Sequence, residues 1–237
     1  MNILVIGGYG SIGSEVSTWY EETNHNVLRL GREDTEFPIG FKGADLVIHC
    51  AGNKYVDRCE NDPIGCVHDN VELAFLTAVQ AKMHGIKKLV YVSTVQAAFP
   101  KNNMAMSKRL AEGMFLQNGY SVIRLVNVKE TRGNVLDLWD QQKKDGKPLT
   151  VVAGAYRYFM SMGEAVQSIM RISNEPPGLY LFKPKDMVYM TGLAQEWNNP
   201  AGIEYVNPGK GGFRYEPEVF DGKWELVEEG GCLWVKR

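Results

Sequence analysis

The sequence is poor in the residues that build metal centres and disulfide frameworks. It has four cysteines, Cys50, Cys59, Cys66 and Cys232, and four histidines among 237 residues. None of them stands at the short paired spacings that zinc ligands use. We therefore predict no metal site, and we expect free thiols in a reducing, cytoplasmic compartment.

Surplus charge and long apolar runs are also missing. The chain has 26 Lys and Arg against 28 Asp and Glu, a formal net charge of −2. Nucleic-acid-binding surfaces usually carry a basic surplus, so we expect no nucleic-acid partner. No apolar run approaches the ~20 residues of a membrane helix, and the opening MNILVIGG is too short for a signal peptide. We therefore expect no membrane span.

What the sequence does contain is a regular alternation of apolar strands and amphipathic helices. Apolar segments near 2–7, 25–32, 44–52, 87–94 and 120–128 alternate with helical segments near 11–22, 71–85 and 105–119. This alternation is typical of an α/β fold with a Rossmann-type doubly wound parallel sheet. After residue 128 the elements become shorter and mixed, with helices near 133–145, 162–173 and 191–197. We predict a dinucleotide-binding core, residues 1–128, interleaved in one structural unit with a smaller mixed C-terminal substrate lobe, residues 129–237.

A glycine-rich turn links the first strand to the first helix. Its sequence GGYGSIG spaces Gly7, Gly10 and Gly13 evenly. Glycines let the backbone approach a pyrophosphate, whose charge meets the free amides at the helix N-terminus. A tight turn without a ligand is the alternative. We predict that the turn binds a dinucleotide through Gly7, Tyr9, Gly10, Ser11, Ile12 and Gly13.

The residues after the second strand bear on the choice of cofactor. The segment LRLGRED offers Arg29 and Arg32, and a guanidinium suits the 2′-phosphate of NADP. We therefore predict NADP. The alternative is NAD, with both arginines solvated and with Glu33 or Asp34 binding the ribose hydroxyls.

Several segments, in order along the chain, resemble one enzyme family. They are the glycine turn, VIHCAGNKYV, LVYVST, NNMAMSKRLAE, VIRLVNVKETRGNVLDLW and YRYFMSMGEAVQSIM. Together they are similar to the extended short-chain dehydrogenases/reductases, in the NAD-dependent epimerase/dehydratase superfamily. Within it they resemble the CapD-type polysaccharide-biosynthesis proteins, which include UDP-N-acetylglucosamine 4,6-dehydratases. YVDRCENDP is also similar to the dTDP-4-dehydrorhamnose reductases, which reduce 4-keto sugars.

The resemblance implies a nicotinamide cofactor and a UDP- or dTDP-linked nucleotide-diphosphate sugar as substrate. It implies that Ala51, Gly52, Ser93 and Lys108 contact the cofactor, with Thr94 near the nicotinamide and sugar. It also implies that Lys54, Asn127, Arg132 and Arg157 contact the nucleotide sugar, Arg157 through a bidentate phosphate contact. The structural alternatives are that Arg132 caps a helix and that Asn127 ties down a turn. Since many relatives pair through the helices flanking the sheet, here 66–84 and 105–118, a homodimer is implied as well.

The catalytic positions depart from the family. The dehydratases carry Thr-Asp-Lys after the fourth strand, where this chain reads Thr94, Val95 and Gln96. The tyrosine that many relatives have four residues before the lysine is Met104. Val95, Gln96 and Met104 cannot exchange protons near neutral pH, and each lost general acid or base is worth about 10²–10⁴-fold in rate. Dehydration needs two such groups, whereas the cofactor carries most of the chemistry of hydride transfer.

We therefore predict an NADP-dependent oxidoreductase that acts at C4 of a nucleotide sugar in polysaccharide or deoxysugar biosynthesis. Thr94, Lys108, Lys54 and Tyr55 are the candidate proton donors. Three alternatives stay open: a catalytically silent nucleotide-sugar-binding homologue, a 4,6-dehydratase with relocated catalytic groups, and a reductase of a non-sugar substrate.

Overall fold

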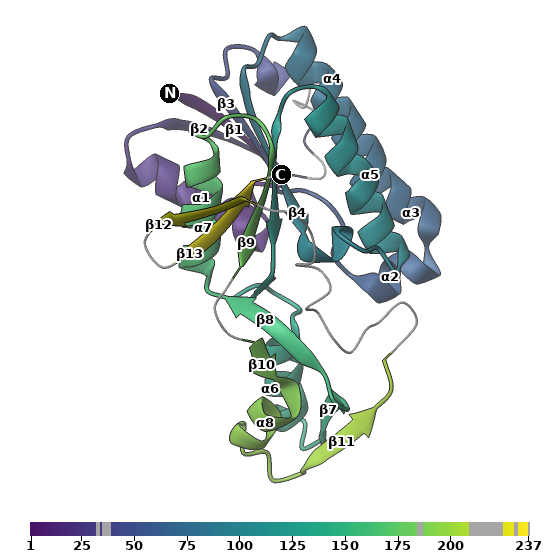
Figure 1. Cartoon of the computed structure of the whole chain (residues 1–237). Helices are drawn as coiled ribbons and strands as arrows, with labels where there is room; N and C mark the ends of the chain where they lie inside the picture. The colour runs from purple at the N-terminus through teal and green to yellow at the C-terminus, as the bar shows by residue number, and fades with distance from the viewer. Residues whose placement is uncertain (32–33, 35–38, 184–186, 209–224, 230–231, 237) are drawn as a thin grey trace.

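The computed structural model places a large α/β layer structure above a smaller lobe (Figure 1). The structure describes residues 1–31, 34, 39–183, 187–208, 225–229 and 232–236. The predicted cofactor contact Arg32 and the alternative Glu33 lie outside these residues. Among the described residues, no helix is both long and apolar enough to cross a membrane.

The main sheet has eight strands in the order β12-β13-β9-β5-β4-β3-β1-β2. Its parallel strands are β1 (Asn2–Ile6), β2 (Asn26–Leu30), β3 (Leu46–His49), β4 (Lys88–Thr94), β5 (Ser121–Leu125) and β9 (Leu179–Lys183). The hairpin of β12 (Glu225–Glu229) and β13 (Cys232–Lys236) adds antiparallel strands beside β9. The order confirms the predicted Rossmann-type sheet. The strand order reverses at β1, between β2 and β3, which is where such folds bind their ligands.

Helices cover both faces of the sheet, which explains why its strands are apolar at nearly every position. On one face, α1 (Ser11–Glu22) and α7 (Met162–Ile172) pack against β1, β3 and β4 through one apolar cluster. On the other face, α4 (Leu73–Met83) and α5 (Asn103–Gln117) pack through a second cluster. Figure 1 shows these helix pairs on opposite sides of the sheet.

The helix ends follow the local sequence. The predicted helix 11–22 is α1 without change. Asn102 caps α5, because its side chain accepts the Ala105 amide proton at 2.8 Å. Gly85 and Gly119, the predicted helix stops, have left-handed φ angles of +67° and +74°.

Two segments differ from the expected pattern. The predicted strand 120–128 is split, because after β5 the chain leaves the main sheet and pairs as β6 (Asn127–Val128) with β8 (Tyr156–Met160). The predicted helix 71–85 is the end of a longer helical run. It starts with α2 (Val56–Asn61) and α3 (Pro63–Val67) and passes through a π-helical turn, η2 (His68–Glu72), into α4.

The smaller lobe is built from short elements. The strands β10 (Met187–Tyr189), β8 and β6 form one sheet, and β7 (Leu149–Val152) pairs with β11 (Ile203–Val206). The helices α6 (Val135–Lys144) and α8 (Met190–Glu196) complete it. Along β8, Tyr158 and Met160 belong to the main core, whereas Phe159 belongs to the core of the lobe around Trp139. Since α7 and β9 pack in the main layer, residues after 128 contribute to both parts.

Between β2 and β3 the structure describes one short 3₁₀ turn, η1 (Ile39–Phe41). Gly40 of this turn packs against Leu4, Leu28 and Leu30, so the turn covers the end of the sheet at β2. Within the described part of the chain, β2 is the edge strand on this side.

Candidate functional site

The glycine turn is shaped by close backbone approaches. Gly7 has φ +80°, and a Cβ placed on it would lie 2.7 Å from the Ala51 amide nitrogen. A Cβ on Gly13 would collide with the Gly7 carbonyl oxygen. Gly10 is the N-cap of α1, where no side chain accepts a cap hydrogen bond and the first turn holds no acidic residue. The turn therefore offers free amides at a helix N-terminus, the arrangement that suits a pyrophosphate.

Lys108 lies beside the end of β3, close to the glycine turn. Its side chain is 7% exposed, its Nζ donates to the Ala51 carbonyl at 3.3 Å, and it stands 5.1 Å from the Tyr91 ring centroid. A Cβ on Gly52 would lie 2.7 Å from this Nζ. The structure thus brings together the predicted cofactor contacts Gly7, Ala51, Gly52 and Lys108.

The environment of Lys108 makes it an unusual lysine. Burial lowers the pKa of Lys108 to about 8, and neighbouring Cys50, Cys59, Cys66 and Glu112 oppose the shift. Its hydrogen bond goes to a neutral carbonyl. A lysine of this kind can release and regain a proton near physiological pH.

Asn70 is a site residue that sequence reasoning missed. Its Oδ1 accepts the Asn53 amide proton at 2.6 Å, and its Nδ2 donates to the Asn53 carbonyl at 3.0 Å and to Ser107 Oγ at 2.9 Å. It ties the loop after β3 to α5 beside Lys108. Asn70 lies in the π-helical turn, and such turns frequently mark functional sites. Asn70 stands in the polar segment HDNVE, so no local pattern in the sequence singled it out.

His49, at the end of β3, was missed as well. The ring is 1% exposed and its Nδ1 lies 3.0 Å from Thr77 Oγ1. Burial, followed by the charge of Lys108, lowers the pKa of His49 to about 3. The imidazole is therefore neutral beneath the lysine. A histidine inside the apolar run LVIHCAG was the signal for it.

Two of the three positions that depart from the family, Val95 and Met104, are filled by apolar packing, whereas Gln96 is half-buried and its Oε1 accepts a hydrogen bond from Asn102 Nδ2 at 3.5 Å. Val95, in the short turn η3 (Val95–Ala97), is 2% exposed and belongs to the main apolar core. Met104 is 4% exposed and packs with Cys59 and Cys66. The remaining neighbour, Thr94, is half-buried and its Oγ1 accepts the Gln96 amide proton at 3.3 Å. Neither Val95 nor Met104 leaves room for a water-exposed acid.

Ser93, a predicted cofactor contact, has a hydrogen-bond partner inside the protein. Its hydroxyl donates to Glu112 Oε1 at 2.7 Å. The same buried carboxylate accepts two bonds from Arg124, at 2.8 and 2.6 Å. The Ser93 hydroxyl thus belongs to a buried ion-pair cluster between β4, β5 and α5.

Arg29, the predicted contact of a 2′-phosphate, is engaged by an acid of the neighbouring helix. Its guanidinium binds both carboxylate oxygens of Glu21, at 3.0 and 2.6 Å, and reaches Thr18 of α1. An acid stands at the end of β2 instead: Asp34 accepts the Gly31 amide proton, next to the Tyr9 ring. Of the two acids named in the alternative, Asp34 is described, and its carboxylate lies beside Gly31.

The predicted substrate contacts fall into two groups. Lys54, Tyr55 and Arg132 meet above the glycine turn, where Lys54 Nζ donates to the Arg132 carbonyl at 2.5 Å. Asn127 and Arg157 lie in the lobe sheet, where they donate to the carbonyls of Tyr158 and Tyr156 at 2.9 and 2.8 Å. Among the described residues, no group of three or more His, Cys, Asp or Glu side chains could hold a metal ion.

Comparison with known proteins now places the chain. The model of the family described as "Polysaccharide biosynthesis protein" matches residues 32–207. The chain belongs to this family. The capsular polysaccharide biosynthesis protein CapD of Staphylococcus aureus is 29% identical, over 69% of this chain and 31% of that protein. The UDP-glucose 4-epimerase of Rickettsia akari is 32% identical, over 71% of this chain and 61% of that protein.

The solved structures agree on the fold. One is the UDP-glucuronic acid 4-epimerase from Bacillus cereus in complex with UDP-glucuronic acid and NAD. It superposes with a TM-score of 0.82 at 15% identity, and the match covers 91% of this chain and 89% of that one. The curated relatives are longer, and the chain spans 31–62% of the length of those it matches.

Proposed function

We propose that the chain is an NAD-dependent oxidoreductase that acts at C4 of a UDP- or dTDP-linked nucleotide sugar. The observation that carries the proposal is the position of Lys108, buried beside the glycine turn with a pKa of about 8. The glycine turn fits a dinucleotide, since a Cβ on Gly7 or Gly13 would fill the backbone cradle. A bound nicotinamide would supply the hydride acceptor and donor.

The partners at the end of β2 support NAD over NADP. Arg29 is already engaged by Glu21, whereas Asp34 holds a carboxylate beside Gly31. A carboxylate accepts hydrogen bonds from ribose hydroxyls and repels a 2′-phosphate. We therefore propose NAD, in place of the NADP expected from the arginines.

The filled positions support C4 redox chemistry over 4,6-dehydration. Elimination needs an acid at the leaving hydroxyl and a base at C5, which the dehydratases carry where this chain has Val95 and Gln96. Val95 is packed in the main apolar core, and neither side chain exchanges protons near neutral pH. Oxidation or reduction at C4 needs one proton acceptor or donor. Lys108 is suited to that role because it exchanges its proton near pH 8. Lys54 is the second candidate, since burial lowers its pKa as well and its Nζ donates to the Arg132 carbonyl.

A catalytically silent binding protein is the second candidate, and the same apolar replacements at Val95 and Met104 favour it. The two candidates differ in turnover and agree in ligand binding. The purified 237-residue chain should bind NAD more tightly than NADP in calorimetric titrations, and it should bind UDP. Asp34→Asn should lower the ratio of the Kd for NADP to the Kd for NAD. Equal or tighter binding of NADP would contradict the cofactor assignment.

Turnover is tested by incubating the chain with NAD and a panel of UDP- and dTDP-hexoses. We expect NADH absorbance at 340 nm or C4 epimers detected by NMR, both lost in Lys108→Met. A 4-keto-6-deoxy product would show dehydration instead. Binding of NAD and UDP without any turnover would leave the silent protein as the function.

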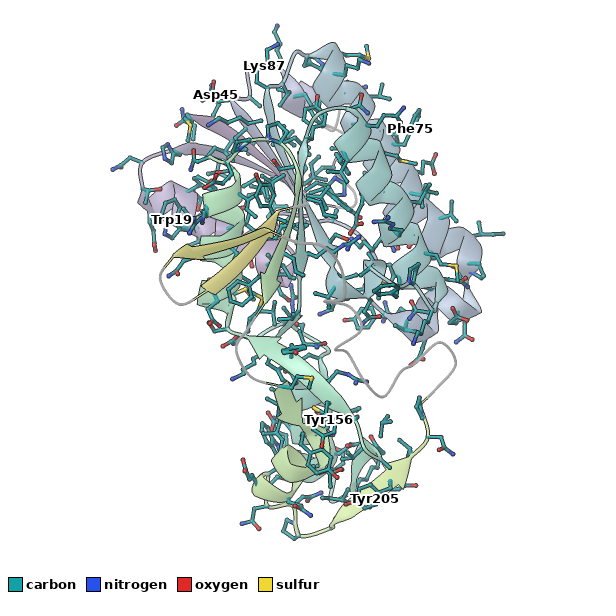
Figure 2. All side chains as sticks on the ribbon, viewed as in Figure 1. Trp19, Asp45, Phe75, Lys87, Tyr156 and Tyr205 are labelled. Atoms are coloured by element: carbon teal, nitrogen blue, oxygen red, sulfur yellow. The ribbon has the colours of Figure 1, made fainter. Side chains whose placement is uncertain are left out.

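We also propose a homodimer formed through α4 and α5. Large apolar side chains are exposed on the outer side of these helices, among them Phe75 at 53%, Met106 at 51% and Leu110 at 56%. Figure 2 labels Phe75 on this outer helix layer. Sedimentation should give a dimer for the wild type and a monomer for Leu110→Glu, and a wild-type monomer would contradict the proposal.

A further inference from the structure

The loop between β6 and α6, residues 129–134, is attached to the glycine turn. The Arg132 backbone N–H donates to Ser11 Oγ at 3.1 Å, and its guanidinium Nη2 donates to the Tyr9 carbonyl at 3.0 Å. These bonds join residues more than 120 positions apart in the sequence. They bring an exposed guanidinium from the start of the smaller lobe to the first turn of α1.

The loop is held in this position from its other side as well. Lys54 Nζ donates to the Arg132 carbonyl at 2.5 Å, and Asp137 accepts the Gly133 amide proton at 2.6 Å. Gly133 has φ +71°, and a Cβ on it would lie 2.6 Å from the Tyr55 hydroxyl oxygen. Because the Gly133 backbone lies so close to Tyr55, a side chain at position 133 would collide with the ring. The contacts of Lys54, Asp137 and Tyr55 thus hold Arg132 beside the glycine turn.

The cationic side chains of Lys54 and Arg132 consequently lie next to the N-terminus of α1, whose first turn has no acidic residue. Burial lowers the pKa of Lys54, Asp137 opposes the shift, and the charge of Arg132 adds to it. The first turn of α1 holds no acidic residue. A bound anion between Arg132, Lys54 and the α1 amides would relieve this repulsion, and a guanidinium suits a phosphate because it binds two oxygens at once.

We propose that Arg132 binds the pyrophosphate of the dinucleotide cofactor, and that it is not a contact of the nucleotide sugar. This inference rests on the proposed function, since it needs a dinucleotide in the glycine turn. The Arg132 guanidinium donates a hydrogen bond to the Tyr9 carbonyl of that turn. Arg157, in contrast, lies on β8 within the lobe sheet. The smaller lobe thus contributes a residue to the cofactor site.

The test compares two ligands in calorimetric titrations of the 237-residue chain. ADP-ribose carries the pyrophosphate without the nicotinamide ring, and UDP represents the sugar substrate. Arg132→Gln should weaken binding of NAD and ADP-ribose about 10–100-fold, the usual effect of losing one charge-assisted phosphate contact, and leave UDP binding within about threefold. Arg132→Lys should fall between, because an ammonium keeps the charge and loses the bidentate geometry.

Lys129→Gln is the matched control, because Lys129 is an exposed cation of the same loop. It should change neither affinity. Weaker UDP binding with unchanged NAD binding in Arg132→Gln would overturn the inference, and so would an equal loss for both ligands. A wild-type protein that binds neither NAD nor ADP-ribose would refute the proposed function itself. Circular dichroism of each variant separates these outcomes from misfolding, and Arg132→Lys serves if the glutamine variant unfolds.

Discussion

Replacement of Lys108 by methionine should stabilise the protein while it abolishes activity. The pKa of Lys108 falls from its ordinary value of 10.5 to about 8, mainly through burial. At about 1.4 kcal/mol per pKa unit, holding this ammonium in the folded protein at pH 7 costs about 3 kcal/mol. Methionine has similar length and no charge. Losing the bond to the Ala51 carbonyl offsets about 1 kcal/mol, so the net gain is about 2 kcal/mol.

The gain should depend on pH with a definite sign. The folded state binds the Lys108 proton more weakly than the unfolded state, so between pH 8 and 10.5 the unfolded chain holds more protons. Stability of the wild type therefore rises with pH across this window. The advantage of Lys108→Met is fully present below pH 8 and shrinks above it, to about two thirds of the charge effect at pH 9.

Urea unfolding at pH 7, 8 and 9 measures the difference, and thermal melting at pH 7 should show a rise of about 4–8 °C. Lys87→Met is the matched control, because Lys87 is an exposed lysine (Figure 2) and its loss should matter little. A Lys108→Met variant that is less stable than the wild type at pH 7 would refute the argument. A stability difference that stays constant from pH 7 to pH 9 would refute it too.

Three further outcomes are expected. If the Lys108 ammonium donates the proton in keto-sugar reduction, kcat/KM should fall as pH rises through about 8, and a profile flat to pH 9.5 would exclude it. Glu112→Gln should lower the free energy of unfolding by about 3–5 kcal/mol, since it breaks a buried pair with Arg124, and an unchanged urea midpoint would contradict this. Gly133→Ala should cost more stability than Gly119→Ala, because both have positive φ and only Gly133 lies against Tyr55.

The sheet could be predicted because its signals are local and repeat along the chain. An apolar strand followed by GGYGSIG and a helical stretch defines β1 and α1 within 22 residues. Gly85 and Gly119 end their helices through their own backbone conformation, which depends little on distant contacts. Family resemblance supplied Lys108 as a candidate, and the structure places its Nζ beside Ala51 and Gly52.

The partners of charged side chains could not be predicted, because they come from other elements. Arg29 lies at a strand end typical of NADP enzymes, but Glu21 of the neighbouring helix binds its guanidinium. Ser93 follows the pattern of a nicotinamide contact, but its hydroxyl donates a hydrogen bond to Glu112. In both cases the sequence shows the residue and not the face on which its side chain lies, since that depends on where the strand enters the sheet.

The cost of Lys108 bears on the choice between an enzyme and a silent binding protein. At the positions where relatives carry an acid and a tyrosine, Val95 and Met104 lie in apolar clusters that suit them. Lys108 is a different case, because it holds a buried charge at a cost of about 3 kcal/mol, a large fraction of the stability of an ordinary domain. A protein that only packed well would place an apolar residue there. The buried lysine therefore favours a site that still binds a cofactor and transfers a proton. Lys108→Met separates this role from stability, because turnover should be lost while the free energy of unfolding should rise.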